Sequence, residues 1–152
     1  MADASPFRHE KADDSPGFLL WKITALWQRT LAGVLGHFGI TQTQYAILAS
    51  LRWREERKLP ATQTDLAEHA KLDKMTLSKA IRRLEDEGVV KRAPSSSDGR
   101  ATDVRLTAKG RNMTQAAIIA IEDADDAFFA SLSATELAAY KGVVTALVAA
   151  NS

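Results

Sequence analysis

The side chains best suited to contacting a ligand are the cations and hydroxyls between residues 73 and 87. At about 100° per residue, Leu77, Ile81 and Leu84 share one narrow helical face, the pattern of a packing surface. The opposite side carries cations that can meet phosphates or guanine edges, and a hydroxyl that can bond a base or the backbone. This exposed set comprises Met75, Thr76, Lys79, Arg82 and Arg83.

The same face has a second interpretation, a solvated helix surface on which Glu85 and Asp86 pair with the neighbouring cations. Asp86 and Glu87 lie near the C-terminal end, where they would repel DNA. If the helix binds DNA, its N-terminal half is therefore the part expected to enter a major groove.

A second cationic feature is expected after Gly88, where apolar and polar residues alternate on both sides of the turn-forming sequence PSSSDGR. This pattern predicts two short strands joined as a hairpin. At its tip, Arg100 can enter a narrow minor groove, whose negative potential favours arginine, while Asp98 either orients the guanidinium or sets the turn. The flanking strands offer three more cations to backbone phosphates: Lys91, Arg92 and Arg105.

Several helices are expected to begin at hydroxyl residues followed three positions later by a side chain that can cap back. Residues 62–70 and about 73–87 are expected to form a pair of shorter helices separated by a brief turn, which is helix-turn-helix spacing. Gly39 and Gly88 each follow an apolar periodic run, as a left-handed residue after a helix does. The expected starts are Thr41 with Gln44, Thr62 with Asp65, Ser133 with Glu136, and Ser15 before Pro16.

From Thr107 the helical period returns, which predicts a helix of about 25 residues and then a last helix. Charge is distributed unevenly along the chain, although the net charge is only +1. Residues 50–112 hold 15 basic and 10 acidic side chains, whereas residues 113–152 hold one basic and five acidic. Positive charge is thus concentrated on the expected helix-turn-helix and hairpin.

Several function classes are excluded or disfavoured. The 152 residues include no cysteine, which excludes thiolate catalysis, cysteine-ligated zinc and cysteine redox sensing. His9, His37 and His69 lack metal-ligand spacing, and no nucleophile elbow or phosphate loop is present, so we expect no metal, no cofactor and no enzymatic activity. Without a signal peptide or a membrane-length apolar segment, a soluble cytoplasmic protein is expected.

The tryptophans form a candidate effector pocket. Trp21, Trp27 and Trp53, with His37, can line a site between a helical core and the DNA-binding segment and stack on an aromatic ligand. The alternative is that the tryptophans are core or interface residues and that His37 complements a helix dipole.

Three ordered segments resemble the MarR family of transcriptional regulators over about residues 17–150: ITQTQYAILASL, TQTDLAEHAKLDKMTLSKAIRRLEDEGVVKR and SSSDGRATDVRLTAKG. The DxR sequence followed by LTxKG is the most specific part. Its residues here are Asp98, Arg100, Leu106, Thr107, Lys109 and Gly110.

The resemblance implies a mainly α winged helix-turn-helix with a two-stranded β wing, and a helical dimerisation region from both chain ends. It further implies a homodimer that binds a pseudo-palindromic operator in double-stranded DNA, usually as a repressor released by a small aromatic or anionic effector. The implied recognition-helix positions are Lys74, Thr76, Ser78, Lys79, Arg82 and Arg83, and the implied wing position is Arg100 supported by Asp98.

The expected organisation is a flexible arm at 1–15, an N-terminal dimerisation helix at 16–40, a DNA-binding domain at 41–106 and dimerisation helices at 107–152. The competing function is a winged-helix protein-interaction module without operator specificity. That module would present an apolar rather than a cationic recognition face.

Overall fold

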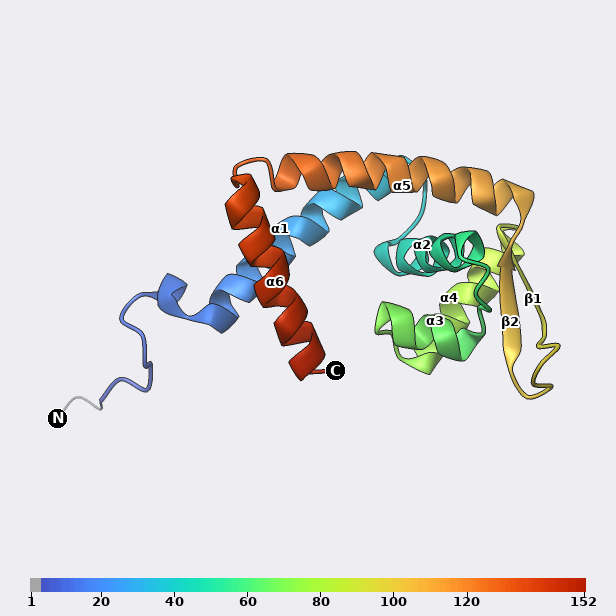
Figure 1. The fold of residues 1–152 in the computed structure, drawn as a ribbon, viewed down its shortest axis with the longest axis horizontal. Coiled ribbons are helices and arrows are strands. Elements are labelled where there is room, and N and C mark those ends of the chain that lie inside the picture. The colour runs from blue at the N-terminus through green and yellow to red at the C-terminus, as the bar shows by residue number, and fades with distance from the viewer. Residues whose placement is uncertain (1–3) are drawn as a thin grey trace.

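The structure is a computed structural model that describes residues 4–152, so residues 1–3 of the expected arm lie outside the described residues. The described chain is mainly helical with one two-stranded antiparallel sheet, which confirms the fold class expected from the sequence (Figure 1). In order, the elements are the short 3-10 helix η1 (Ala12–Asp14), α1 (Pro16–Gly36), α2 (Gln42–Glu56), α3 (Gln63–Ala70), α4 (Lys74–Asp86), β1 (Val90–Pro94), β2 (Thr102–Leu106), α5 (Ala108–Phe128) and α6 (Ala134–Ala150).

The helices α1, α2, α3 and α6 begin at the capping residues that the sequence predicts. Thr41 accepts the Gln44 backbone N–H at 3.1 Å, while the Gln44 side chain accepts the Thr41 N–H at 3.0 Å. The same reciprocal pair begins α3 at Thr62 and α6 at Ser133, and Ser15 caps α1. These bonds satisfy backbone donors that have no partner inside a helix.

Two groups of elements lie at opposite ends of α5 (Figure 1). Helices α2, α3 and α4 pack with the sheet at one end, and α1 and α6 lie toward the other. Most fully buried large side chains belong to the first group, which therefore contains the main core: Ile47, Leu48, Leu66, Leu77, Ile81, Leu84, Val89, Val90 and Val104.

Helix α5 is shorter than the expected 25 residues, because it ends at Phe128. The chain turns through residues 129–133, where Ser133 caps the next helix by accepting the Glu136 N–H at 3.1 Å. The sequence predicted a longer helix because Phe128, Phe129 and Leu132 are all apolar, so the apolar pattern does not stop at this turn.

Candidate nucleic-acid interface

Helix α4 begins at a capping carboxylate that the sequence analysis did not identify. Asp73 accepts the backbone N–H of Thr76 at 2.8 Å with one oxygen and the Thr76 hydroxyl at 2.6 Å with the other. The hydrogen bond from that hydroxyl, together with the one from the backbone, holds the pKa of Asp73 below its ordinary range. The sequence did contain a signal for this cap, because Asp73 stands at the helix start three residues before Thr76.

One face of α4 is buried and the other is exposed, as the spacing predicts. Leu77, Ile81 and Leu84 are at most 1% exposed. Five of the six expected recognition-helix residues are exposed, and Ser78 is half-buried. A shallow concavity of about 530 Å³ on this face is lined by Met75, Thr76, Ser78, Lys79 and Arg82.

The cations of this face differ in their partners. Arg83 pairs with Glu87 at 3.5 Å. Within residues 4–152, no carboxylate lies within 4.0 Å of Lys74, Lys79 or Arg82. The ion pairs with Glu85 and Asp86 that the solvated-surface alternative expected on this face are therefore not formed in residues 4–152.

Glu85 instead joins α4 to the sheet. One of its carboxylate oxygens accepts from Nε and Nη2 of Arg92 at 3.2 and 2.9 Å, and the other accepts the Arg92 backbone N–H at 3.0 Å. These bonds lower the pKa of Glu85, the side-chain bond most. Arg92 was expected to meet DNA phosphates, but its guanidinium is held on Glu85, so that expectation is corrected.

The hairpin presents its cations at the tip and on its outer face. Lys91 lies opposite Arg105 in the antiparallel register, and both are exposed. At the tip, Asp98 accepts the backbone N–H of Arg100 at 3.0 Å. Of the two roles considered for Asp98, the structure shows the turn-setting one, while the Arg100 side chain is exposed.

The LTxKG residues anchor α5 on the end of α4. Thr107 donates its hydroxyl to the Gly88 carbonyl at 2.7 Å and accepts the Gly110 N–H at 3.0 Å, while Lys109 donates to the Glu87 carbonyl at 3.0 Å. This part of the motif therefore fixes where the long helix leaves the wing.

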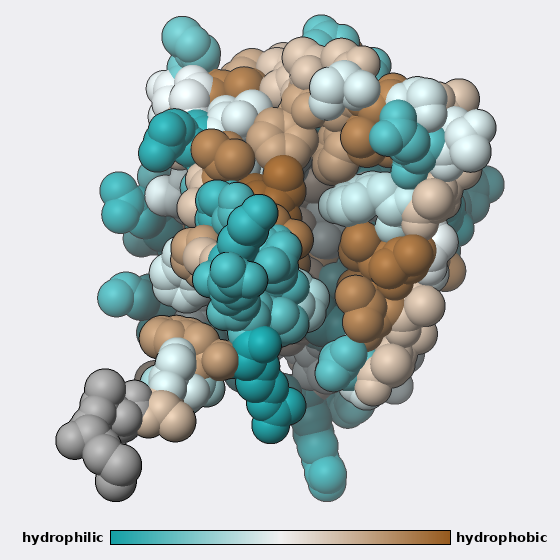
Figure 2. All heavy atoms as spheres, turned by 90° about the vertical axis from the view of Figure 1, so that its left-hand side faces the viewer, coloured by the Kyte–Doolittle hydropathy of each residue, from teal (hydrophilic) through white to brown (hydrophobic). Residues whose placement is uncertain are grey.

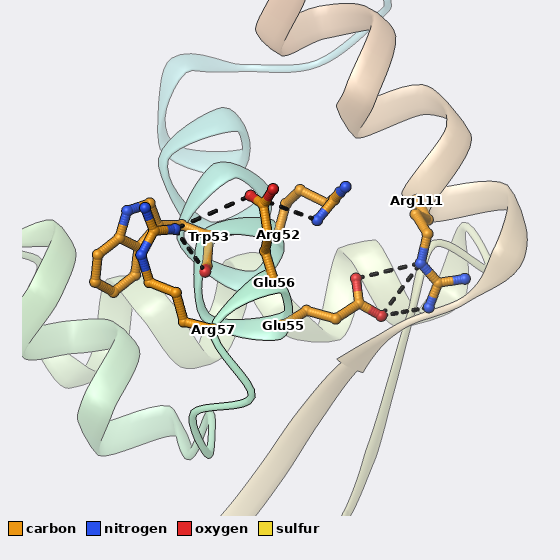
Figure 3. A network of polar contacts seen from close by, with 6 residues as sticks. All are labelled: Arg52, Trp53, Glu55, Glu56, Arg57 and Arg111. Atoms are coloured by element: carbon orange, nitrogen blue, oxygen red, sulfur yellow. Dashed lines mark hydrogen bonds and ion pairs between the residues drawn. The ribbon is translucent and has the colours of Figure 1, made fainter.

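A polar network connects α5 with the end of α2 (Figure 3). Arg111 of α5 donates to both carboxylate oxygens of Glu55, which lowers the pKa of Glu55. Nearby, the Arg57 guanidinium stacks on Trp53 at 4.1 Å from the ring centroid, and Trp53 contacts the ring of His69 edge-on. These contacts hold α2, α3 and α5 in one unit.

The four candidate effector residues do not meet in the single protomer, which corrects the expectation of one shared pocket. Trp27 lines a groove of about 580 Å³ between α1, α5 and α6. His37 lines a separate depression between α1 and α5, Trp53 packs against Arg57 and His69, and Trp21 is 75% exposed. They lie apart because α1 and α2 carry them to different ends of the molecule.

Residues 4–152 contain neither a metal-binding cluster nor a membrane-spanning helix. No group of three or more His, Cys, Asp or Glu side chains in this range is close enough to hold a metal ion. None of the helices in the same range has the length and apolar character needed to cross a bilayer.

Helices α3 and α4, joined by a short turn in which Lys71 adopts a left-handed conformation with φ 53°, form a helix-turn-helix, and the β1–β2 hairpin follows as the wing. Fold and site together define a winged helix-turn-helix protein.

Comparison with known proteins supports this class. Residues 40–102 match the model of the MarR family. The HTH-type transcriptional regulator YdcH of Bacillus subtilis is 35% identical over 117 residues, 77% of this chain and 80% of YdcH. The HTH-type transcriptional repressor Rv2887 of Mycobacterium tuberculosis is 30% identical over 137 residues, 90% of this chain and 96% of the repressor.

Among solved structures, MepR of S. aureus in a complex with DNA superposes with a TM-score of 0.80 at 23% identity, covering 90% of this chain and 98% of MepR. The chain belongs to the MarR family of transcriptional regulators. The matched relatives are named as regulators or repressors and not as enzymes, in agreement with the sequence analysis.

Proposed function

We propose that this protein is a homodimeric, ligand-responsive repressor that binds a pseudo-palindromic operator. In each protomer, the N-terminal half of α4 enters a major groove and Arg100 enters the adjacent minor groove. In this proposal residues 41–106 bind DNA, and residues 16–40 and 107–152 form the dimer. In this proposal the protein acts in the cytoplasm.

The observation that carries the proposal is the exposed charge of Lys74, Lys79 and Arg82 on α4, which no carboxylate of residues 4–152 neutralises, followed by exposed Arg100 at the wing tip. Guanidinium and ammonium groups of this kind supply most of the electrostatic affinity for DNA. MepR, which shares the fold, is described in a complex with DNA. A protein-interaction module would need an apolar α4 face, where this chain has cations around a single exposed Met75.

A second copy of the chain accounts for the apolar surface of α1 and α6. No residue of α6 is buried in the protomer. Trp21 is 75% exposed, and Leu20, Val143 and Leu147 are 57% to 65% exposed. Figure 2, seen from the side where α1 and α6 lie, shows hydrophobic side chains gathered in patches on this face. Monomers rarely leave contiguous apolar area of this kind uncovered.

The aromatic groove beside Trp27 supports the effector part of the proposal. Trp27 and Phe128 have ring centroids 5.2 Å apart, and Phe129 and Tyr140 extend the aromatic wall. Lys141 lines the same groove and offers a cation to an anionic group. PcaV of Streptomyces coelicolor, a structural neighbour at 22% identity, is described in complex with its natural ligand. A second protomer packed on α1 and α6 would supply the missing wall.

The proposal is tested by mobility shift with the DNA upstream of the protein's own gene and by light scattering. We expect a dimer that binds one duplex in preference to its scrambled version. A monomer, or equal binding to both duplexes, contradicts the proposal.

The effector part is tested by screening small aromatic acids for displacement of the operator, with thermal shift as a second readout. A compound that binds the free and the DNA-bound protein equally tightly cannot displace the DNA. Release of the operator would therefore show that the compound binds the free protein more tightly.

A further inference from the structure

The hydrogen bond between Thr76 and Asp73 fixes which way the Thr76 hydroxyl points. A threonine hydroxyl has one proton to donate and two lone pairs that accept. An ionised carboxylate only accepts, so across the 2.6 Å contact Thr76 must be the donor and Asp73 the acceptor. The bonds that lower the pKa of Asp73 keep it ionised near neutral pH. The single proton of Thr76 is therefore directed at its own helix cap.

Thr76 lines the concavity on α4 together with Lys79 and Arg82. Thr76 is exposed, and only lone pairs remain for a group that enters from solvent. In the major groove, adenine presents its N6 amino group and cytosine its N4 amino group as donors. Guanine O6 and N7 and thymine O4 only accept. An unconstrained threonine can bond either kind of base edge, but this one can bond only the amino kind.

We propose that Asp73 leaves the Thr76 hydroxyl able only to accept a hydrogen bond from a base. Each half-site would then require adenine or cytosine, and disfavour guanine or thymine, at the base that Thr76 faces. This inference rests on the proposed operator binding. Thr76 contacts the base, and Asp73 is a positioning residue that acts through Thr76. Turning the hydroxyl outward would break a charge-assisted hydrogen bond, which is stronger than one between neutral groups.

The test compares sequences enriched from a random duplex library by the wild-type protein and three variants. Thr76→Val removes the hydroxyl and keeps the side-chain shape, while the Asp73 cap on the Thr76 backbone N–H remains. We expect this variant to lose its amino-base preference at one position per half-site, by roughly tenfold for one lost hydrogen bond. Thr76→Ser keeps the hydroxyl and is expected to keep the wild-type preference.

Asp73→Asn tests whether the direction of the Thr76 hydroxyl proton sets the base preference. Asparagine is as good a helix cap as aspartate, so the helix start is preserved. Its amide can donate to the Thr76 hydroxyl, which frees the hydroxyl proton to point outward. We expect the preference at that one position to relax toward guanine and thymine. Removing a negative charge also raises affinity for every duplex, so the readout is the ratio between bases and not the affinity itself.

Base analogues check the same contact from the DNA side. Replacing the selected adenine by unsubstituted purine, or the selected cytosine by 2-pyrimidinone, removes only the amino group. The wild-type protein should lose roughly tenfold in affinity, and Thr76→Val should lose nothing.

Three outcomes overturn the inference: unchanged preferences in Thr76→Val, a lost preference that was for guanine or thymine, or a strict amino-base preference that survives in Asp73→Asn. A wild-type protein that enriches no sequence at all contradicts the proposed operator binding itself, and this separates the two failures.

Discussion

A surface cation is available to a polyanion only when no carboxylate already neutralises it. The cations around the wing differ in this respect: Arg92 is held by Glu85 through three hydrogen bonds, and Arg83 pairs with Glu87. Lys79 has no carboxylate of residues 4–152 within 4.0 Å. Counting basic residues in the sequence therefore overestimates the number that can bind DNA, and the ion pairs identify the ones to test.

Arg100→Ala is the sharpest single-residue test of the wing. Its guanidinium is exposed, so its removal should leave thermal unfolding unchanged, while operator affinity should fall at least about tenfold because a minor-groove arginine is lost. Fluorescence anisotropy measures the affinity. Arg8→Ala, which removes an exposed cation outside the proposed DNA-binding residues 41–106, serves as the control and should bind as wild type. Wild-type affinity in Arg100→Ala would remove the wing tip from the mechanism.

Local spacing predicted which residues of α4 are buried better than it predicted their polar partners. The buried face of α4 follows from the helical period, because Leu77, Ile81 and Leu84 lie three or four positions apart on one element. The bond from Glu85 to Arg92 was missed because periodicity within one helix does not show which residue of a following strand lies opposite it. The Asp73 cap is as local as the Thr41 and Thr62 caps, and the same capping rule identifies it.

At the scale of elements, the hydrogen bonds between Glu85 of α4 and Arg92 of β1 fix the wing relative to the recognition helix. Because binding to Arg92 lowers the pKa of Glu85, its ionised form favours the folded state. That stabilisation is present above the ordinary glutamate pKa of about 4.3 and is lost as pH falls through the lowered folded-state value.

Glu85→Gln should therefore lower the midpoint of thermal unfolding at pH 7, and the difference from wild type should shrink as pH falls from about 5 toward 3. At neutral pH the same substitution should reduce the preference for the operator over its scrambled version, because the wing is no longer held against α4. In an Arg92→Met background, Glu85→Gln should have a much smaller effect on both readouts. A difference in midpoint that does not change with pH would contradict this role for the carboxylate.

The start of α5 provides a second prediction about elements. A Cβ on Gly110 would overlap the backbone carbonyl of Val89, so Gly110→Ala must displace α5 from the end of α4. We expect a loss of about 1–3 kcal/mol or more in unfolding free energy, measured by urea denaturation. Gly33→Ala in α1, where nothing lies within 4 Å of the added carbon, is the matched control. It should gain about 0.5–1 kcal/mol from helix propensity. Equal effects would refute the close approach at Gly110.

At the scale of the whole molecule, the fold separates the two charge blocks in space. Residues 50–112, with their excess of five positive charges, include α3, α4 and the wing at one end of the protomer, while acidic residues 113–152 extend to α6 at the other (Figure 1). Such a charge distribution orients the cationic end toward a polyanion. The sequence predicted the separation, but the apolar stripes of α1 and α6 could not show whether their own chain or a second copy covers them.

Salt dependence tests this arrangement as a whole. If the dimer neutralises about ten phosphates, log K for the operator should fall against log salt concentration with a slope of about −9, because each neutralised phosphate releases about 0.9 counterions. Each substitution occurs twice in a dimer, so Lys79→Ala or Arg82→Ala should reduce the slope by about 1.8 if that residue contacts one phosphate. Arg92→Met should leave the slope nearly unchanged because Glu85 already neutralises Arg92. A nearly flat titration of the wild-type protein would mean that the cationic end does not face the DNA backbone.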